Sequence, residues 1–273
     1  MGPRHRHQLE LVVLAVTVIG LSRLLDGPLI WPVAGLLLAA VWLGGRAVLF
    51  DGAMRPAPVP LEATIIPAIV AVGALGSIRI VPLGLALVPA LIGAGLLLDV
   101  ALRLETRVFD RPGGMTQVDR TSLLGTALAA AFLAFLGVAS MITGGIVEPG
   151  PGATDLGPPI SETGIVAIAL ADAFVAGLLG YRFAVERLAG MSDAIWSAGT
   201  YAASIAIAAG VLRAVDTPRL LFPALLTLVF YLWDTVRGTA PAQRRDPRFL
   251  WQSVLLTALA VAVLAWNLGL RGT

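Results

Sequence analysis

The sequence predicts an all-α protein, a polytopic transmembrane helix bundle of about nine spans, and two observations lead to this prediction. Hydrophobic residues make up 58% of the 273 positions, whereas charged residues reach only 13%, about half the share of a typical soluble chain. A soluble globule of this length could not cover its surface with so few charges. The apolar residues also fall into runs of about 20, the length that a helix needs to cross a bilayer.

Clusters of Pro, Gly and charged residues separate these runs from one another. We expect helices over Gln8–Leu25, Leu29–Phe50, Leu61–Ile78, Val81–Leu102, Ser122–Val147, Thr163–Leu188, Ala194–Val215, Leu220–Arg237 and Phe249–Leu270. Only Arg79 divides the third segment from the fourth, which predicts a tight hairpin there. The first segment follows a basic start, but no small-residue cleavage site comes after it, so we expect a retained helix rather than a signal peptide.

The placement of arginine predicts the orientation of the chain. All 19 basic residues are Arg, and if successive loops alternate across the membrane, 14 lie on one side and 5 on the other. Because cytoplasmic loops collect positive charge, we expect a cell-membrane protein with a cytoplasmic N-terminus and an external C-terminus. The basic stretch Glu105–Arg120 could also bind anionic lipid headgroups.

The residue types that are missing exclude several kinds of chemistry. The chain has no Cys and no Lys, and its two His residues, His5 and His7, precede the first apolar segment. Thiolate metal sites, Schiff bases and buried imidazole ligands are therefore excluded. We expect no cofactor, no metal and no nucleic-acid partner.

Two parts of the chain resemble each other in a way that predicts an internal repeat. The third and fourth segments recur in the seventh and eighth at an offset of 134 residues. The matching positions in the first copy are Gly76, Arg79, Val81, Pro89, Ala90, Leu91, Leu98 and Arg103. Within a single membrane domain we expect a 4+4 parallel repeat over residues 1–120 and 121–238, followed by one extra span over residues 239–273.

This repeat carries further expectations about geometry. Four spans per repeat would send both halves into the membrane in the same direction, related by a two-fold rotation about the membrane normal. Several transporters are built from parallel repeats of this kind. Pro89 and its counterpart Pro223 are expected to kink their helices in mid-span.

Asp172 is the strongest candidate for a functional residue. It lies near the middle of the sixth segment, where a charge costs ~2.5–3.5 kcal/mol on insertion scales. Ala169, Ala176 and Gly180 follow the same helical face, and this stripe of small residues predicts that the carboxyl group points into the protein. We expect hydrogen bonding to a polar partner at the same depth, and Tyr201 or Ser204 of the seventh segment could supply it. Asp172, Tyr201 and Ser204 would then bind a substrate or a proton, or Asp172 could serve only as an interhelix hydrogen bond.

A second group of polar residues lies at the predicted cytoplasmic ends of the helices. Asp99 and Arg103 share one helical face, as do Asp234 and Arg237. With two further arginines they could form a gate or an anion-binding vestibule, or they could simply pair and anchor helix ends. The six residues are Asp99, Arg103, Asp234, Arg237, Arg46 and Arg182.

The sequence is compatible with three functions, and it identifies no substrate for any of them. The first is a small-solute or proton-coupled transporter with its site near Asp172. The second is a non-catalytic membrane subunit or assembly protein. The third, a lipid- or isoprenoid-processing enzyme, would depend on the charged residues near Asp99 and Asp234, and we favour it least. Expected partners are membrane lipids and either further copies of the chain or other membrane subunits.

Overall fold

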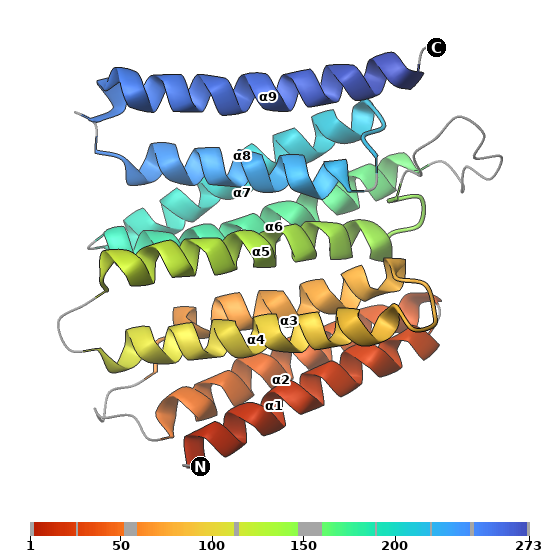
Figure 1. The fold of residues 1–273 in the computed structure, drawn as a ribbon, viewed down its shortest axis with the longest axis vertical. Coiled ribbons are helices and arrows are strands. Elements are labelled where there is room, and N and C mark those ends of the chain that lie inside the picture. The colour runs from red at the N-terminus through yellow and green to blue at the C-terminus, as the bar shows by residue number, and fades with distance from the viewer. Residues whose placement is uncertain are drawn as a thin grey trace.

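The computed structural model describes residues 3–25, 27–51, 59–111, 115–146, 160–188, 190–218, 220–240 and 243–271. These residues form α-helices and short 3₁₀ turns, with no strand among them (Figure 1). The helices are α1 (Pro3–Leu21), α2 (Ile30–Phe50), α3 (Ile65–Ser77), α4 (Leu87–Asp110), α5 (Gln117–Met141), α6 (Glu162–Arg187), α7 (Met191–Ala214), α8 (Leu221–Gly238) and α9 (Pro247–Arg271).

The described helices have the character of membrane spans. Eight of them, all except α8, are long and apolar enough to cross a bilayer. The exception has only 18 residues, and these include Asp234 and Arg237. Large apolar side chains are also exposed on the outside, among them Leu85 at 92% and Trp196 at 76%. Such a surface suits lipid rather than water, so the chain is a multi-pass helical bundle.

Helix α4 departs from the segment predicted for it. Residues 81–86 precede the helix, where Gly84 has a φ of +148°, and the helix then continues to Asp110. As a result Pro89 is the third residue of α4, and Pro223 is likewise the third residue of α8. The expected mid-span kinks are therefore wrong, because backbone N–H groups in a first helical turn have no intrahelical acceptor to lose.

The first eight helices pack in two layers. One layer contains α1, α4, α5 and α8 in that order, and the other contains α2, α3, α6 and α7 (Figure 1). Helix α9 lies beyond α8 at the edge, and none of its membrane-length segment is buried. The N-terminal helices therefore lie at one edge of the bundle, and the C-terminal helix α9 lies at the opposite edge.

The junction between the first four helices and the next four is a close crossing of α3 and α5. A Cβ atom on Gly76 would lie 2.5 Å from the Cα atom of Gly137, and one on Gly73 would lie 2.7 Å from the backbone nitrogen of Ala134. The Ser140 hydroxyl donates a hydrogen bond to the Gly76 carbonyl at 2.6 Å. Small residues therefore allow the two backbones to touch.

This junction does not fit the expected two-fold rotation about the membrane normal. Such a rotation would exchange α3 with α7 and α5 with α1, so packing of α3 on α5 would require packing of α7 on α1. Helices α1 and α7 are not a packed pair and lie toward opposite ends of the bundle (Figure 1). The two sets of four helices instead lie side by side along the bundle, with α3 and α4 of the first set packed on α5 of the second.

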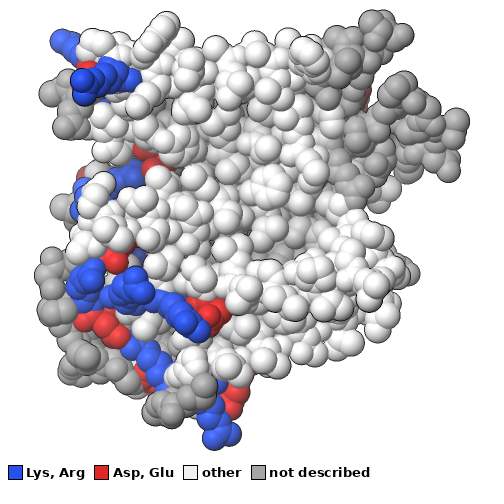
Figure 2. Space-filling view, viewed as in Figure 1, with Lys and Arg blue, Asp and Glu red and all other residues white. Residues whose placement is uncertain are grey.

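Charged side chains gather at one end of the helices, at the left of Figure 2. Helices α1, α3, α5, α7 and α9 begin at this end, and α2, α4, α6 and α8 finish there (Figure 1). We call it the charged end. Asp172 is the eleventh residue of α6 and so lies in the half of that helix away from the charged end.

Candidate functional site

Asp172 is completely buried inside the bundle, as the stripe of small residues on α6 predicts. Its exposed fraction is 0%, and Ala176, one turn further along the same face, is also fully buried. Neither carboxylate oxygen of Asp172 has a hydrogen-bond partner within the described part of the chain. The predicted direction of the side chain is confirmed, but the predicted hydrogen bond is not formed.

Arg213 of α7 is a second buried charged residue near Asp172. It lies in the last turn of α7, is 3% exposed and stacks its guanidinium 3.8 Å above the centre of the Phe222 ring. Gly177 of α6 faces Ala202 of α7 and Gly180 faces Tyr201, so Arg213 lies only about 6–9 Å along the bundle axis from the level of Asp172. No hydrogen bond or ion pair joins the two described side chains. Nε and Nη1 of Arg213 also have no hydrogen-bond partner in the described residues. Two opposite charges are thus buried near each other without direct contact.

Sequence reasoning did not connect Arg213 with Asp172. At the offset of 134 residues, Arg213 is the repeat counterpart of Arg79, and the sequence pattern indicated no other role for it. The signal that could have revealed the pair is the short link between α6 and α7, which makes them antiparallel neighbours. An Arg at the far end of α7 can then extend its long side chain down toward the middle of α6.

Tyr201 and Ser204 do not bond to Asp172. The phenolic hydroxyl of buried Tyr201 donates to Oδ1 of Asp234 at 2.7 Å, and the Ser204 hydroxyl donates to the Thr200 carbonyl at 2.8 Å. Gly180 of α6 faces Tyr201, where an added Cβ would lie 2.5 Å from the ring. Gly180 lies eight residues beyond Asp172, which is about 12 Å along a helix. Tyr201 is therefore too near the charged end to meet Asp172.

Buried Asp234 pairs with the partly exposed Arg187 of α6 rather than with Arg237. Nη2 of Arg187 donates to Oδ2 of Asp234 at 3.0 Å, and Nη1 of Arg187 lies 2.9 Å from Oδ1. With the Tyr201 hydroxyl, this network joins α6, α7 and α8. The predicted pair with Arg237 is not among the ion pairs of the described residues, and Arg187 was not singled out by the sequence.

Asp99 and Arg103 form the predicted i,i+4 pair at 2.8 Å, with Arg103 58% exposed. The Gln8 side chain also donates to Oδ1 of Asp99 at 2.7 Å, which ties α1 to α4. This pair belongs to the first four helices, and α4 and α8 are not a packed pair. The carboxylates of Asp99 and Asp234 therefore occupy separate clusters rather than one cleft.

Arg182 is buried inside the bundle instead of lining a vestibule. Its Nε and Nη2 donate to the two carboxylate oxygens of Glu105 at 3.0 and 2.8 Å, and Nη1 donates to Glu186. Arg182 is 4% exposed and Glu105 only 1%. This bidentate pair joins α4 to α6 across the junction of the two sets of helices. Arg46 is half-buried on α2 and is not part of this cluster.

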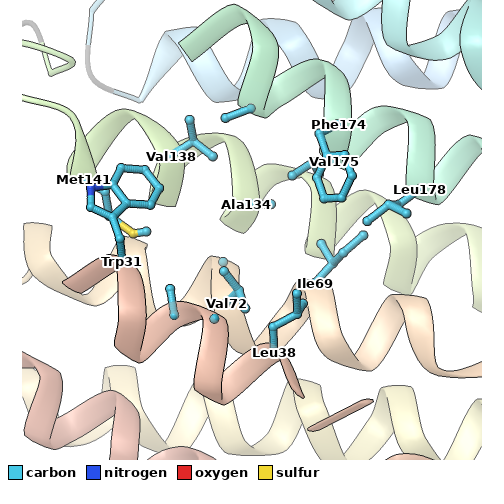
Figure 3. Close-up of a pocket in the computed structure, with 14 residues that line it drawn as sticks. Trp31, Leu38, Ile69, Val72, Ala134, Val138, Met141, Phe174, Val175 and Leu178 are labelled. Carbon is cyan, nitrogen blue, oxygen red and sulfur yellow. The ribbon is translucent and has the colours of Figure 1, made fainter. Parts of the chain in front are cut away.

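A groove of about 330 Å³ lies where α2, α3, α5 and α6 meet (Figure 3). Its walls are apolar, with Trp31, Met141 and Phe174 among the larger side chains. Ala171 and Val175 line it, but Asp172 between them does not. The groove is therefore not lined by the buried carboxylate and offers no polar site of its own.

No known family model, no curated protein and no solved structure matches the chain. The functional interpretation therefore comes from the chain's own residues.

Proposed function

We propose that the protein is a proton-coupled carrier of a small solute, with Asp172 as its proton-binding residue. The observation that carries this proposal is that Asp172 is fully buried while both of its oxygens lack a hydrogen bond. A carboxyl group in this position costs free energy. A purely structural Asp would recover that cost through an interhelix hydrogen bond, and Asp172 makes none within the described residues. Its carboxyl group is available to a proton or a ligand.

The packing of the helices supports the proposed internal repeat over residues 1–120 and 121–238. Within the first set, the pairs α1–α2, α2–α3, α3–α4 and α1–α4 pack together. The corresponding pairs in the second set, α5–α6, α6–α7, α7–α8 and α5–α8, pack as well. Helix α9 lies outside both sets of four helices, as expected for an additional span.

The proposed topology has nine spans, a cytoplasmic charged end and an external C-terminus. Helix α8 is included because it packs between α5 and α7, which are themselves long and apolar enough to span the membrane. Reporter fusions after Gly113 and Gly152, which lie outside the described residues, test the orientation. A reporter that is active only in the cytoplasm should work at Gly113 and fail at Gly152, and the opposite result would overturn the topology.

A second candidate function is that of a non-catalytic membrane subunit, and α9 favours it. None of the membrane-length segment of α9 is buried against the other helices. Trp251 and Trp266 of this helix are 72% and 74% exposed. A lipid- or isoprenoid-processing enzyme has less support, because Asp99 and Asp234 do not share a cleft.

Transport is tested with the purified full chain in liposomes that contain a pH-sensitive dye. Small carboxylates, amino acids, sugars and inorganic cations are added outside one at a time, and the internal pH is followed. A solute that is carried with protons should acidify the interior, and Asp172→Asn should abolish this signal because an amide does not exchange a proton at this site. Glu10→Gln serves as the matched control and should keep the signal, because Glu10 is an exposed carboxylate that pairs with Arg6 on α1.

The result also separates the two candidate functions. Acidification that depends on Asp172 and not on Glu10 supports the carrier. If no solute class produces it, or if Asp172→Asn transports as the wild type does, the carrier proposal is wrong. Purification of the chain in a stable complex that is lost when α9 is deleted would then support the subunit.

A further inference from the structure

We propose that Arg213 and Asp172 together form a binding site for a small monocarboxylate, which binds the guanidinium when a proton neutralises Asp172. This inference rests on the proposed carrier function and names its substrate class. It starts from two side chains that are each more than nine-tenths buried and that retain polar atoms without hydrogen-bond partners in the described residues.

Arg213 is the fixed positive charge of this site. A guanidinium stays protonated in proteins and presents several N–H donors that suit a carboxylate. Arg182 shows this geometry in the same chain, because it holds the Glu105 carboxylate through Nε and Nη2. In Arg213, Nε and Nη1 have no such acceptor in the described residues, and the Phe222 ring lies 3.8 Å below the guanidinium. The aromatic face supports the position of the cation and leaves its edge for a ligand.

Asp172 is the negative charge whose protonation would regulate the site. When it is ionised, it balances Arg213, and an incoming anion meets two charges that cancel each other. When it is protonated, the net charge of the site becomes more positive by one unit and an anion is attracted more strongly. Proton binding and anion binding should therefore favour each other, and by linkage each increases the affinity for the other by the same factor.

Apart from Arg213, no described titratable group of the helices packed against α6 lies in the half of its helix away from the charged end. Helix α3 has none in its 13 residues, and the groups on the other elements lie in their charged-end halves. These groups are Asp193 and Tyr201 on α7, Asp119 and Arg120 on α5, Tyr231, Asp234 and Arg237 on α8, and Glu62 in the 3₁₀ turn Leu61–Thr64 before α3. Asp216, just after α7, acts electrostatically on Arg213.

The location of the pair also suits a carrier. Arg213 is the penultimate residue of α7, at the end of the bundle opposite the charged end, and Asp172 lies about 6–9 Å deeper along the bundle axis. In the proposed topology this is the external side. A monocarboxylate arriving from outside would meet the guanidinium first and the proton-binding group below it.

The experiment measures equilibrium binding of radiolabelled lactate to the purified full chain, from mildly acidic to mildly alkaline pH. Lactamide, which has the same shape without the charge, is the competitor control. Wild-type protein should bind lactate best at low pH, and the apparent Kd should rise by up to about tenfold per pH unit once Asp172 is ionised. Lactamide should not compete.

Four variants decide the roles of the two residues. Asp172→Asn should bind lactate with little dependence on pH, because the site then keeps its positive charge. Arg213→Gln should lose binding at every pH, and Arg213→Lys should weaken it. Arg79→Gln is the matched control and should bind like the wild type, since Arg79 occupies the equivalent place in the first set and its Nη1 already donates to the Leu25 carbonyl at 3.1 Å.

The inference is overturned if Asp172→Asn keeps the wild-type pH dependence, if Arg213→Gln binds normally, or if lactamide competes. Should Arg213→Gln fail to fold, the Asp172→Asn result still decides. If lactate does not bind but another solute class drives Asp172-dependent acidification of liposomes, only the substrate assignment fails. If no solute does so, the proposed function fails as well.

Discussion

The buried ion pair between Glu105 and Arg182 should be a main stabilising contact between α4 and α6, and Glu105→Gln tests this. The carboxylate accepts two hydrogen bonds from the guanidinium, at 3.0 and 2.8 Å. The two side chains are 1% and 4% exposed, so water cannot replace either partner. The substitution keeps the size of the side chain but removes its negative charge.

The expected loss follows from what Arg182 retains. Removing one partner of a buried pair typically costs about 3–5 kcal/mol, because the remaining charge is left without compensation. Here Arg182 still donates to Glu186, and the amide oxygen of Gln can accept one of the two lost bonds. We therefore expect Glu105→Gln to lower the free energy of unfolding by about 3 kcal/mol, the low end of that range.

The assay is reversible unfolding in mixed micelles with increasing amounts of a denaturing detergent, followed by tryptophan fluorescence. Asp99→Asn is the matched control on the same helix. Its partner Arg103 is 58% exposed, so this pair should contribute only about 0–1 kcal/mol. A double variant, Glu105→Met with Arg182→Met, should recover most of the loss, because it leaves no buried charge behind.

Two results would refute this reasoning. Glu105→Gln could prove as stable as the wild type, which would mean that the pair contributes little. Asp99→Asn could instead cost as much as Glu105→Gln, which would mean that burial does not set the magnitude.

Three further substitutions test other contacts by the same unfolding assay. Gly76→Ala should destabilise the protein by about 1–3 kcal/mol, because its Cβ would lie 2.5 Å from a backbone atom of α5, whereas Gly93→Ala has open space and should not. Tyr201→Phe should cost about 1.5–3 kcal/mol through the lost hydrogen bond to a carboxylate, while Tyr181→Phe should stay within about 0.5 kcal/mol. Asp172→Asn should not lower stability, since neither carboxylate oxygen has a hydrogen bond to lose in the described residues, and a loss above about 2 kcal/mol would show a structural role instead.

The sequence by itself determined the class of fold and the approximate position of each helix. Apolar runs of membrane length, separated by Pro, Gly and charges, are local properties that need no knowledge of neighbours. The same holds for the direction of Asp172, because the small residues at i−3, i+4 and i+8 share its helical face. The Asp99–Arg103 pair was also predictable, since both residues lie on one exposed turn of a single helix.

Only the tertiary structure decided which helices meet and which side chains pair across them. Glu105 and Arg182 are 77 residues apart, and nothing local marks them as partners. The register of α6 against α7 places Gly180 opposite Tyr201, so the tyrosine bonds to Asp234 and Asp172 keeps no hydrogen-bond partner in the described residues. Hydropathy predicts that a helix lies in the membrane, but it does not distinguish between the possible neighbouring helices. Lipid tails are as apolar as most helix surfaces, so apolar contact alone favours no particular neighbour. The choice of neighbour comes from close packing at small residues and from the few buried polar contacts, and both exist only once the helices have assembled.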